Sequence, residues 1–261
     1  MTFVVHTIPA FSDNYLWLIQ QEGSRQAYVV DPGDAVPIQV KLAELNLELA
    51  GILVTHQHPD HIAGIPALLE HRSVPVYGPA DISVVSHPVS DGDTLDIAGE
   101  TFEVIAVPGH TLNHIAYYAK PAAQSPVLFC GDTLFACGCG RLFEGTPEKM
   151  YHSLQRLSQL PPGTLAYCAH EYTMGNINFA LAVEPDNQDL QMRMEDCQEK
   201  RSRDCPTVPF TLSTEIKTNP FLRSDAPSVI AAAKQKDESA DNSIAVFTAI
   251  RHWKDNFWPS L

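Results

Sequence analysis

Positive charge is scarce in this chain, where 17 lysines and arginines face 31 aspartates and glutamates among 261 residues. The net charge of −14 repels a phosphate backbone over most of the surface, so we expect no nucleic-acid partner. Long apolar runs are also missing, since no stretch approaches the roughly 18 residues that a membrane-spanning helix needs. The first residues lack the basic start and long apolar core of a signal peptide. We therefore expect a cytoplasmic protein that does not bind a membrane.

Cysteine spacing shows no disulfide framework. The six cysteines are scattered over a long chain, which fits reduced thiols in a reducing compartment. Cys137 and Cys139 flank one glycine and could form a thiolate pair for a metal, but no second pair exists, so a tightly turning reduced loop is favoured. With 44% hydrophobic and 18% charged residues, the chain has the composition of a globular protein of one or two domains.

Segment 55–61, with the sequence THQHPDH, concentrates residues that can bind a metal. It follows an apolar, strand-like run at residues 51–54. His56 and His58 alternate at the end of this expected strand, whereas Asp60 and His61 follow as the chain turns away. Neutral imidazole and carboxylate are ligands for zinc, iron or manganese and do not make a calcium cage. The segment therefore predicts metal ligands, and solvated histidines in a polar loop are the weaker interpretation.

Three further candidate ligands follow strand-like runs downstream. His110 comes after the run at residues 102–107, Asp132 follows an apolar run that starts at residue 128, and His170 follows another that starts at residue 167. Each lies where an expected strand gives way to a loop, which is where rigid scaffolds hold reactive groups. A lone histidine after a strand is more often structural. Together with segment 55–61, however, these residues predict a metal site.

This ordered set of motifs resembles the metallo-β-lactamase superfamily of dinuclear metal hydrolases. More narrowly, the chain is similar from end to end to the glyoxalase II family, the hydroxyacylglutathione hydrolases. The superfamily motifs are THQHPDH at 55–61, GHT at 109–111, GDT at 131–133 and HEY at 170–172. The narrower similarity rests on IPAFSDNY at 8–15, CGRLFEGT at 139–146, HEY at 170–172, NPFLR at 219–223 and RHWKD at 251–255.

The resemblance implies two divalent metal ions, with zinc favoured and iron or manganese also compatible. The implied ligands are His56, His58 and His110 for the first ion, Asp60, His61 and His170 for the second, and Asp132 as the bridge between them. Asp60 and Asp132 count as catalytic in this family, because they hold the ions that activate a shared hydroxide.

The implied reaction is hydrolysis of the thioester of S-(2-hydroxyacyl)glutathione, typically S-D-lactoylglutathione, to glutathione and D-lactate. It is the second step of methylglyoxal detoxification, and a hydroxide bridging the two ions would attack the thioester carbonyl. The resemblance assigns the glutathione contacts to Arg141, Phe143, Tyr172, Arg251 and Lys254. Guanidinium and ammonium groups suit the carboxylates of glutathione, and Arg251 and Lys254 share one face of an expected helix.

Other activities on the same scaffold are alternatives. A mononuclear-iron persulfide dioxygenase usually has one working iron and lacks the terminal helix with Arg251 and Lys254. Another metal-dependent thioesterase or a lactonase would use the same ligands. A β-lactamase is disfavoured by His61 and by the missing export signal. A scaffold that only binds partners is disfavoured because every candidate ligand is present.

The order of expected elements is mixed α/β, which can also be described as α+β. Strands are expected at residues 3–8, 15–20, 27–31 and 51–55 and again at 94–97, 102–107, 115–118 and 127–130. Helices are expected at residues 35–47, 65–70 and 147–160, the last of them starting with Thr146 as N-cap and Pro147. With the resemblance, this order implies an αββα sandwich of the metallo-β-lactamase type.

Beyond residue 173 the pattern becomes helical. Helices are expected at residues 176–183, 186–200 and 243–255, and loops at 205–209 and 218–220. We therefore expect a metal-binding domain at residues 1–173 and a smaller α-helical, substrate-binding domain at residues 174–261. A monomer is expected, while metal identity, oligomeric state and acyl-group preference are left open.

Two residues depart from the family pattern. Asn113 stands where relatives commonly have glycine, and because asparagine tolerates left-handed backbone we expect the turn to be preserved. Phe143 stands where some relatives have tyrosine, which removes one hydrogen bond to substrate. The sequence does not show how either departure affects the rate. His114 is expected to be a supporting or structural residue and not a ligand, and Asp13 and Asp31 are expected to accept hydrogen bonds from ligand histidines.

Overall fold

The computed structural model describes residues 3–257, and packing divides the chain into two compact units. The first unit contains the residues up to 106 together with 113–131, and the second contains 107–112 together with the residues from 132 onward. The predicted boundary between residues 173 and 174 divides a metal-binding domain from a substrate-binding domain. It differs from this division by packing, and it stays a prediction. Residues 1–2 and 258–261, which the predicted domains include, lie outside the described residues.

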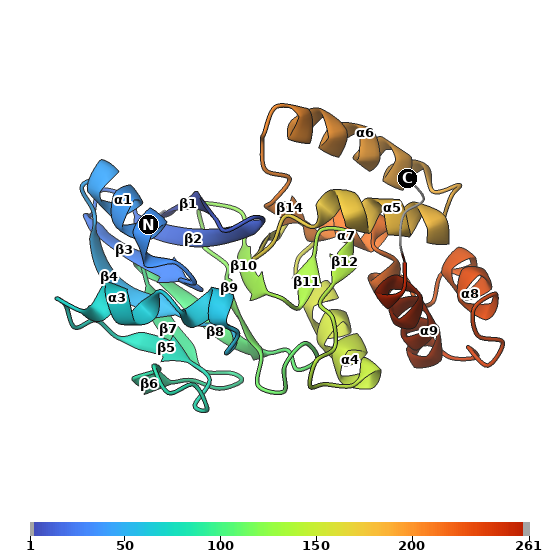
Figure 1. Cartoon of the computed structure of the whole chain (residues 1–261), viewed down its shortest axis with the longest axis horizontal. Helices are drawn as coiled ribbons and strands as arrows, with labels where there is room; N and C mark the ends of the chain where they lie inside the picture. The colour runs from blue at the N-terminus through green and yellow to red at the C-terminus, as the bar shows by residue number, and fades with distance from the viewer. Residues whose placement is uncertain (1–2, 258–261) are drawn as a thin grey trace. The chain divides into compact units, whose positions relative to one another are not determined.

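The first unit contains two β-sheets (Figure 1). One sheet has the strand order β1(Phe3–Ala10), β2(Asn14–Gln21), β3(Gln26–Val30), β4(Glu48–Leu53), β5(Val76–Gly78) and β6(His87–Pro88). Its first three strands pair antiparallel, and β3 to β6 pair parallel. Within this unit the other sheet is antiparallel, in the order β10(Val127–Gly131), β9(Ile115–Ala119), β8(Glu100–Ala106) and β7(Thr94–Ile97).

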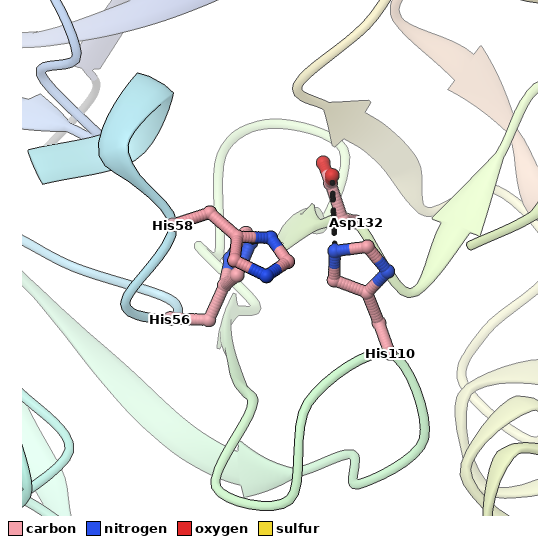
Figure 2. Close-up of side chains that lie close together, drawn as sticks. All are labelled: His56, His58, His110 and Asp132. Atoms are coloured by element: carbon pink, nitrogen blue, oxygen red, sulfur yellow. Dashed lines mark hydrogen bonds and ion pairs between the residues drawn. The ribbon is translucent and has the colours of Figure 1, made fainter. Parts of the chain in front are cut away.

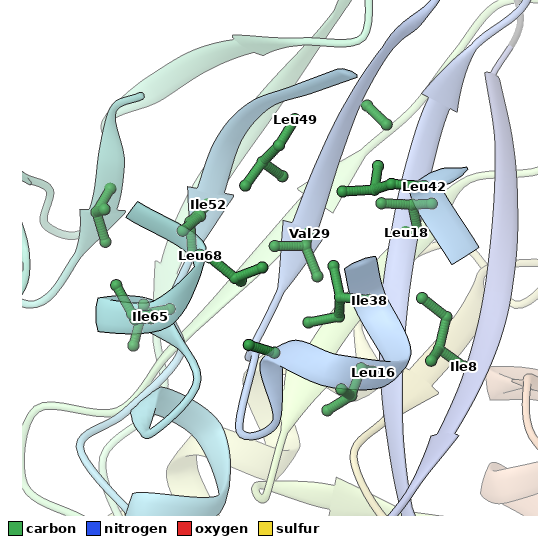
Figure 3. Packing of buried hydrophobic residues seen from close by; sticks show 14 of the residues in the cluster. Ile8, Leu16, Leu18, Val29, Ile38, Leu42, Leu49, Ile52, Ile65 and Leu68 are labelled. Carbon is green, nitrogen blue, oxygen red and sulfur yellow. The ribbon is translucent and has the colours of Figure 1, made fainter. Parts of the chain in front are cut away.

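Two helices, α1(Ala35–Glu44) and α3(Ile65–Leu69), pack against the first sheet and enclose the core of this unit. Figure 3 shows Ile38 of α1 among side chains of the strands, including Leu16, Val29 and Ile52. All four are at most 1% exposed, and burial of each such side chain contributes roughly 1.5–3 kcal/mol. This packing fixes β4, whose carboxyl end leads into segment 55–61.

Helix α1 is shorter than the expected helix at residues 35–47. Asn46 adopts a left-handed φ of 52°, which ends the helix, and β4 starts at Glu48, earlier than expected. The short parallel strands β5 and β6 were not expected at all. The short helix α2(Pro59–Ile62) within the ligand segment was also not foreseen.

The second unit is mainly helical (Figure 1). Its helices are α4(Pro147–Ser158), α5(Thr173–Val183), α6(Gln188–Ser202), α7(Leu212–Thr218), the 3₁₀ helix η1(Pro220–Leu222), α8(Pro227–Lys234) and α9(Ser243–Asp255). Two hairpin strands, β11(Leu134–Phe135) and β12(Gly138–Cys139), pair with each other, as do β13(Leu165–Cys168) and β14(Phe210–Thr211). Ile177 and Ala180 of α5 pack against Leu190 of α6 in a buried cluster.

Most expected helices of this unit are confirmed. Thr146 caps α4 by accepting a hydrogen bond from the backbone N–H of Lys149, and α9 has the expected bounds. Helix α6 starts two residues later than expected because Asn187 is its N-cap. The expected loop at residues 218–220 is wrong, since Thr218 ends α7 and Pro220 begins η1. Across residues 3–257, no helix has the length and apolar character needed to cross a membrane.

Candidate metal centre

The first unit presents two imidazoles side by side at the end of β4. His56 is buried and His58 partly buried, and Nε2 of His56 lies 3.0 Å from Nδ1 of His58 (Figure 2). Nitrogen ligands of one tetrahedral zinc, with bonds of about 2.1 Å, stand roughly 3.4 Å apart. The two side chains therefore have the spacing of ligands to a single metal ion.

Asp60 and His61 form a second pair of potential ligands in the same unit. Both lie in the one-turn helix α2, which Pro59 starts, and Oδ2 of Asp60 is 3.5 Å from Nε2 of His61. Asn14 donates a hydrogen bond of 3.0 Å to the same oxygen of Asp60. Nδ1 of His61 lies 3.0 Å from Oδ2 of Asp31, so Nε2 is the nitrogen left for a metal.

Asp31 supports this segment from a strained backbone position. Its φ of 50° is left-handed, which is uncommon for a residue other than glycine. The buried carboxylate accepts hydrogen bonds of 2.7 Å from both the backbone N–H and the hydroxyl of Thr55. Asp31 therefore fixes the start of segment 55–61 and the ring of His61 together. The contact between Asp31 and the ring of His61 fits the supporting role expected of Asp31, and Asp13 accepts a hydrogen bond of 3.0 Å from the hydroxyl of Ser12.

The second unit contains a carboxylate between two imidazoles. Oδ2 of Asp132 lies 3.4 Å from Nε2 of His110, as Figure 2 shows, and Oδ1 lies 3.4 Å from Nε2 of His170. All three residues are buried, each at most 6% exposed. Each oxygen of Asp132 thus faces a different histidine, which is the arrangement of a carboxylate that can serve two metal ions.

Backbone and aromatic contacts orient the two histidines of the second unit. Nδ1 of His110 is 2.7 Å from the carbonyl oxygen of Arg141, and because a carbonyl only accepts, Nδ1 carries the proton and Nε2 the lone pair. The ring of His170 stacks on that of Tyr172, with centroids 4.6 Å apart and an angle of 5°. The neighbouring Glu171 accepts hydrogen bonds from the backbone N–H and the hydroxyl of Thr207.

Two glycines permit close backbone approaches beside the candidate ligands. A Cβ atom on Gly140 would lie 2.0 Å from the carbonyl oxygen of Asp132, and one on Gly33 would lie 1.8 Å from that of Asp60. Any larger residue would push these ligands out of place. Gly140, the first glycine of the CGRLFEGT motif, is therefore required by the geometry around Asp132.

Three of the predicted substrate contacts are exposed on the second unit. The side chain of Arg141 is 60% exposed, with Nε 3.6 Å from Oδ1 of Asp255. Phe143 is 62% exposed and its ring meets His110 edge-on. Tyr172 is also exposed, on the ring of His170. An exposed aromatic ring thus lies against each of the two histidines of this unit, Phe143 on His110 and Tyr172 on His170.

The other two predicted contacts are on α9 and are less accessible. Arg251 is only 5% exposed, and its guanidinium donates to the carbonyl of Cys139 at 3.0 Å and to Asp255. Lys254 is partly buried, with Nζ 5.4 Å from the centroid of the Phe179 ring. Burial, and next the charge of Arg251, lower the pKa of Lys254.

The segment with Cys137 and Cys139 forms a tight hairpin, β11–β12, with free and buried thiols. Cys137 turns the chain with a left-handed φ of 58°, and its backbone N–H donates to Glu215. Burial raises the pKa of both thiols, which disfavours the thiolate that a metal would need. The predicted tight turn at Cys137 and Cys139 is confirmed.

His114 and Asn113 lie in the first unit. His114 is fully buried and stacks on His56, with ring centroids 4.6 Å apart, which fits the predicted supporting role. Asn113 lies in a turn, as expected, but it is not among the described residues with positive φ. The expectation that asparagine is needed here for a left-handed backbone is therefore wrong. The side chain of Asn113 donates a hydrogen bond to Asp81.

Sequence analysis assigned no role to Asn14 or to Asp255. Asn14 begins β2 and reaches Asp60 across 46 residues of sequence, which no local pattern indicates. Asp255 lies four residues after Arg251 on an expected helix, and that spacing is a recognised signal of an ion pair.

Comparison with known proteins places this fold and these motifs in a family. Residues 11–170 match the model of the metallo-beta-lactamase superfamily, and residues 171–257 match that of the hydroxyacylglutathione hydrolase C-terminus. The first match covers more than half of the chain, and it identifies a metallo-β-lactamase-type α/β protein followed by a helical domain. More narrowly, the chain belongs to the hydroxyacylglutathione hydrolase family. Both the predicted fold class and the predicted family are confirmed.

Relatives match along nearly the whole chain. The hydroxyacylglutathione hydrolase of Pseudomonas aeruginosa (strain LESB58) is 49% identical over 97% of this chain and 99% of its own length. That of Nitrosomonas eutropha (strain DSM 101675 / C91 / Nm57) is 46% identical over 97% of this chain and 98% of its own. Among solved structures, ETHE1 from Myxococcus xanthus is 25% identical, with a TM-score of 0.65 over 97% of this chain and 98% of that chain.

Proposed function

We propose that this protein is a metal-dependent thioester hydrolase acting on S-(2-hydroxyacyl)glutathione, typically S-D-lactoylglutathione, and releasing glutathione and D-lactate. The observation that carries the proposal is the identity of 49% over 97% of the chain to a protein named hydroxyacylglutathione hydrolase. The relatives from Pseudomonas aeruginosa and Nitrosomonas eutropha are hydrolases by name, which favours hydrolysis over the persulfide dioxygenase alternative. The reaction would be the second step of methylglyoxal detoxification.

We propose that the predicted ligands bind two metal ions. We assign His56, His58 and His110 to one ion, Asp60, His61 and His170 to the other, and Asp132 to both. The donor set fits, because imidazole and carboxylate bind zinc, iron and manganese alike, and zinc is the proposed ion. When bound, the ions would lower the pKa of a water molecule and polarise the thioester carbonyl.

Neighbouring side-chain and backbone groups hold the proposed ligands in the orientation that metal binding needs. Asp31 holds the ring of His61, and Asn14 holds the carboxylate of Asp60, the first of the two proposed catalytic aspartates. The carbonyl of Arg141 fixes the proton of His110 on Nδ1. Asp132, the second catalytic aspartate, keeps one oxygen for each neighbouring histidine. Such supporting hydrogen bonds typically change metal affinity or activity about 10–100-fold.

Glutathione is proposed to bind through Arg141, Phe143, Tyr172, Arg251 and Lys254. The exposed guanidinium of Arg141 can pair directly with a carboxylate, and the exposed rings of Phe143 and Tyr172 offer apolar contact. Because Arg251 is almost fully buried, its positive charge acts on the substrate mainly through space. Phe143 offers no hydroxyl, so this position contributes contact area alone.

The proposed setting is the cytoplasm, with the protein acting as a monomer on a small molecule. Cys205 is exposed and the other cysteines are buried, and all are free thiols, which fits a reducing compartment. The net charge of −14 argues against nucleic-acid partners, and we propose no membrane partner.

Loss of thioester absorbance is the test of this function. Metal-replete protein is incubated with S-D-lactoylglutathione, and a chelator-treated sample is the control. We expect fast hydrolysis that the chelator abolishes and that added zinc restores. If protein with two bound metal ions leaves the thioester intact but consumes oxygen with glutathione persulfide or opens a lactone, the corresponding alternative replaces this proposal.

A further inference from the structure

Asp255 is an acidic side chain beside two of the cationic groups that the proposed glutathione site uses. It ends α9, and its Oδ1 accepts hydrogen bonds from Nε and Nη2 of Arg251 at 3.2 and 2.8 Å. The same oxygen lies 3.6 Å from Nε of Arg141. One carboxylate oxygen thus contacts two guanidinium groups that are 110 positions apart in the sequence (251 − 141).

By charge alone, a carboxylate is unfavourable at this position. It repels the carboxylates of an approaching glutathione and offsets part of the attraction of the two arginines. It also stands at the carboxyl end of a helix, where the helix dipole disfavours an anion. A group that opposes both substrate charge and helix dipole requires a compensating role.

The contacts of Arg251 indicate what this role is. Its Nη1 donates to the carbonyl of Cys139 at 3.0 Å, while Asp255 holds Nε and Nη2. The guanidinium carbon also lies 4.9 Å from the ring centroid of Phe221, so the group is fixed on several sides. Cys139 precedes Arg141 by two residues. Asp255 therefore contacts Arg141 directly. Through Arg251 it also fixes the backbone at Cys139, two residues before Arg141.

We propose that Asp255 is a positioning residue that orients the exposed Arg141 for a glutathione carboxylate and holds the buried Arg251 in place beside it. It supplies the negative charge that lets two like-charged guanidiniums lie close together, and it limits the conformations of the exposed Arg141 side chain. A preoriented guanidinium loses less entropy on binding than a free one. This inference rests on the proposed function and adds a residue to its substrate site.

Replacement of Asp255 by asparagine separates positioning from simple repulsion. If the carboxylate only repels substrate, Asp255→Asn lowers KM for S-lactoylglutathione. Positioning predicts that KM rises about tenfold while kcat changes less than about twofold, because binding shared by ground and transition states is lost. A neutral thioester, S-lactoyl-N-acetylcysteamine, should show unchanged kcat/KM. Asp196→Asn, an equal charge change at an exposed pair with Lys200, is the matched control.

A double-mutant cycle tests whether Asp255 acts through Arg141. In an Arg141→Ala background, Asp255→Asn should raise KM much less than in the wild type, because the guanidinium that it positions is gone. Full additivity of the two effects, or an unchanged or lower KM in the single Asp255→Asn variant, overturns the proposal.

Thermal unfolding accompanies these assays, since Asp255→Asn removes the counter-ion of a buried arginine. If that variant does not fold, Asp255→Glu keeps the charge but displaces it by one methylene. It should fold and raise KM about threefold with kcat retained, and an unchanged KM refutes the positioning role. Failure of the wild type to hydrolyse S-lactoylglutathione contradicts the proposed function, whereas wild-type activity with an unaffected Asp255→Asn variant contradicts only this inference.

Discussion

Asp132 presents one carboxylate oxygen to His110 and the other to His170. Replacement by alanine would remove both contacts and leave the imidazoles without a shared anion. We expect Asp132→Ala to lose bound metal and to lower kcat/KM by more than about 100-fold, beyond the effect of a supporting residue. Metal analysis of the purified variant and thioester hydrolysis measure the two effects. Full metal content with normal turnover would contradict the bridging role.

A second prediction at the residue scale is that Lys254, a proposed glutathione contact, makes substrate binding depend on pH. Burial and the charge of Arg251 lower the pKa of Lys254, so the ammonium loses its proton below the ordinary lysine value of about 10.4. Its attraction for an anionic ligand is present at neutral pH and is lost as pH rises through the lowered pKa.

The inhibition constant of S-methylglutathione between about pH 7 and pH 9.5 measures this loss. We expect weaker inhibition at the alkaline end in the wild type. Lys254→Arg, which keeps its charge throughout this range, should show only the titration of the inhibitor itself. Parallel profiles for the two proteins would show that Lys254 does not contribute its charge to binding.

Among the elements, the hairpin β11–β12 is anchored by a buried ion pair. Glu215 of α7 is fully buried and pairs with Arg193 of α6. It also accepts hydrogen bonds from the backbone N–H of Cys137 at 2.8 Å and from the amide of Asn219 at 2.9 Å. Burial acts to lower the pKa of Arg193, but the Glu215 carboxylate raises it above its ordinary value, so the guanidinium stays charged.

Glu215→Ala should therefore destabilise the protein by roughly 3–5 kcal/mol, because a buried guanidinium is left without its counter-ion. Urea unfolding of the metal-free protein measures this change without the contribution of metal binding. The control is Glu199→Ala, which breaks an exposed pair with Arg203 and should cost less than about 1 kcal/mol. Equal losses of unfolding free energy in the two variants would mean that the buried ion pair stabilises the protein no more than the exposed pair does.

The elements that sequence reasoning recovered are those with long periodic patterns or clear caps. Helix α9 was predicted with its observed bounds, and Thr146 marked the start of α4. Helices α7 and α8 were missed because they are only 7 and 8 residues long and leave too few positions to show a period. The strand-to-loop placement of candidate ligands was predictable from residue type and position. The hydrogen bond from Arg251 to Cys139 was not, since it joins residues 112 positions apart.

For the whole molecule, the net charge of −14 opposes an anionic substrate at long range. Raising ionic strength from about 0.01 M to about 0.15 M shortens the Debye length from about 30 Å to about 8 Å, which screens this distributed repulsion but not contacts of a few ångströms. We expect kcat/KM for S-lactoylglutathione to rise about threefold over this range.

The neutral thioester S-lactoyl-N-acetylcysteamine provides the comparison and should show little change with salt. A fall of kcat/KM for the glutathione thioester would mean that the local field of Arg141 and Lys254 attracts substrate over distances longer than the Debye length. That result would reverse our view of how an acidic protein collects an acidic substrate.

The interleaving of the two units along the chain sets an order for biosynthesis. The first unit includes residues 113–131, so it can close only when β10 has left the ribosome. Asp132 follows at once, but His170 is 39 residues beyond residue 131 (170 − 131), a delay of about 2–8 s at roughly 5–20 residues per second. If the proposed ligands are correct, the first unit can be folded for several seconds while His170, one of the ligands, has not yet been made. The proposed ligand set is therefore complete only once 170 of the 261 residues have been made, and a metal ion can meet all of its ligands no earlier than that point of synthesis.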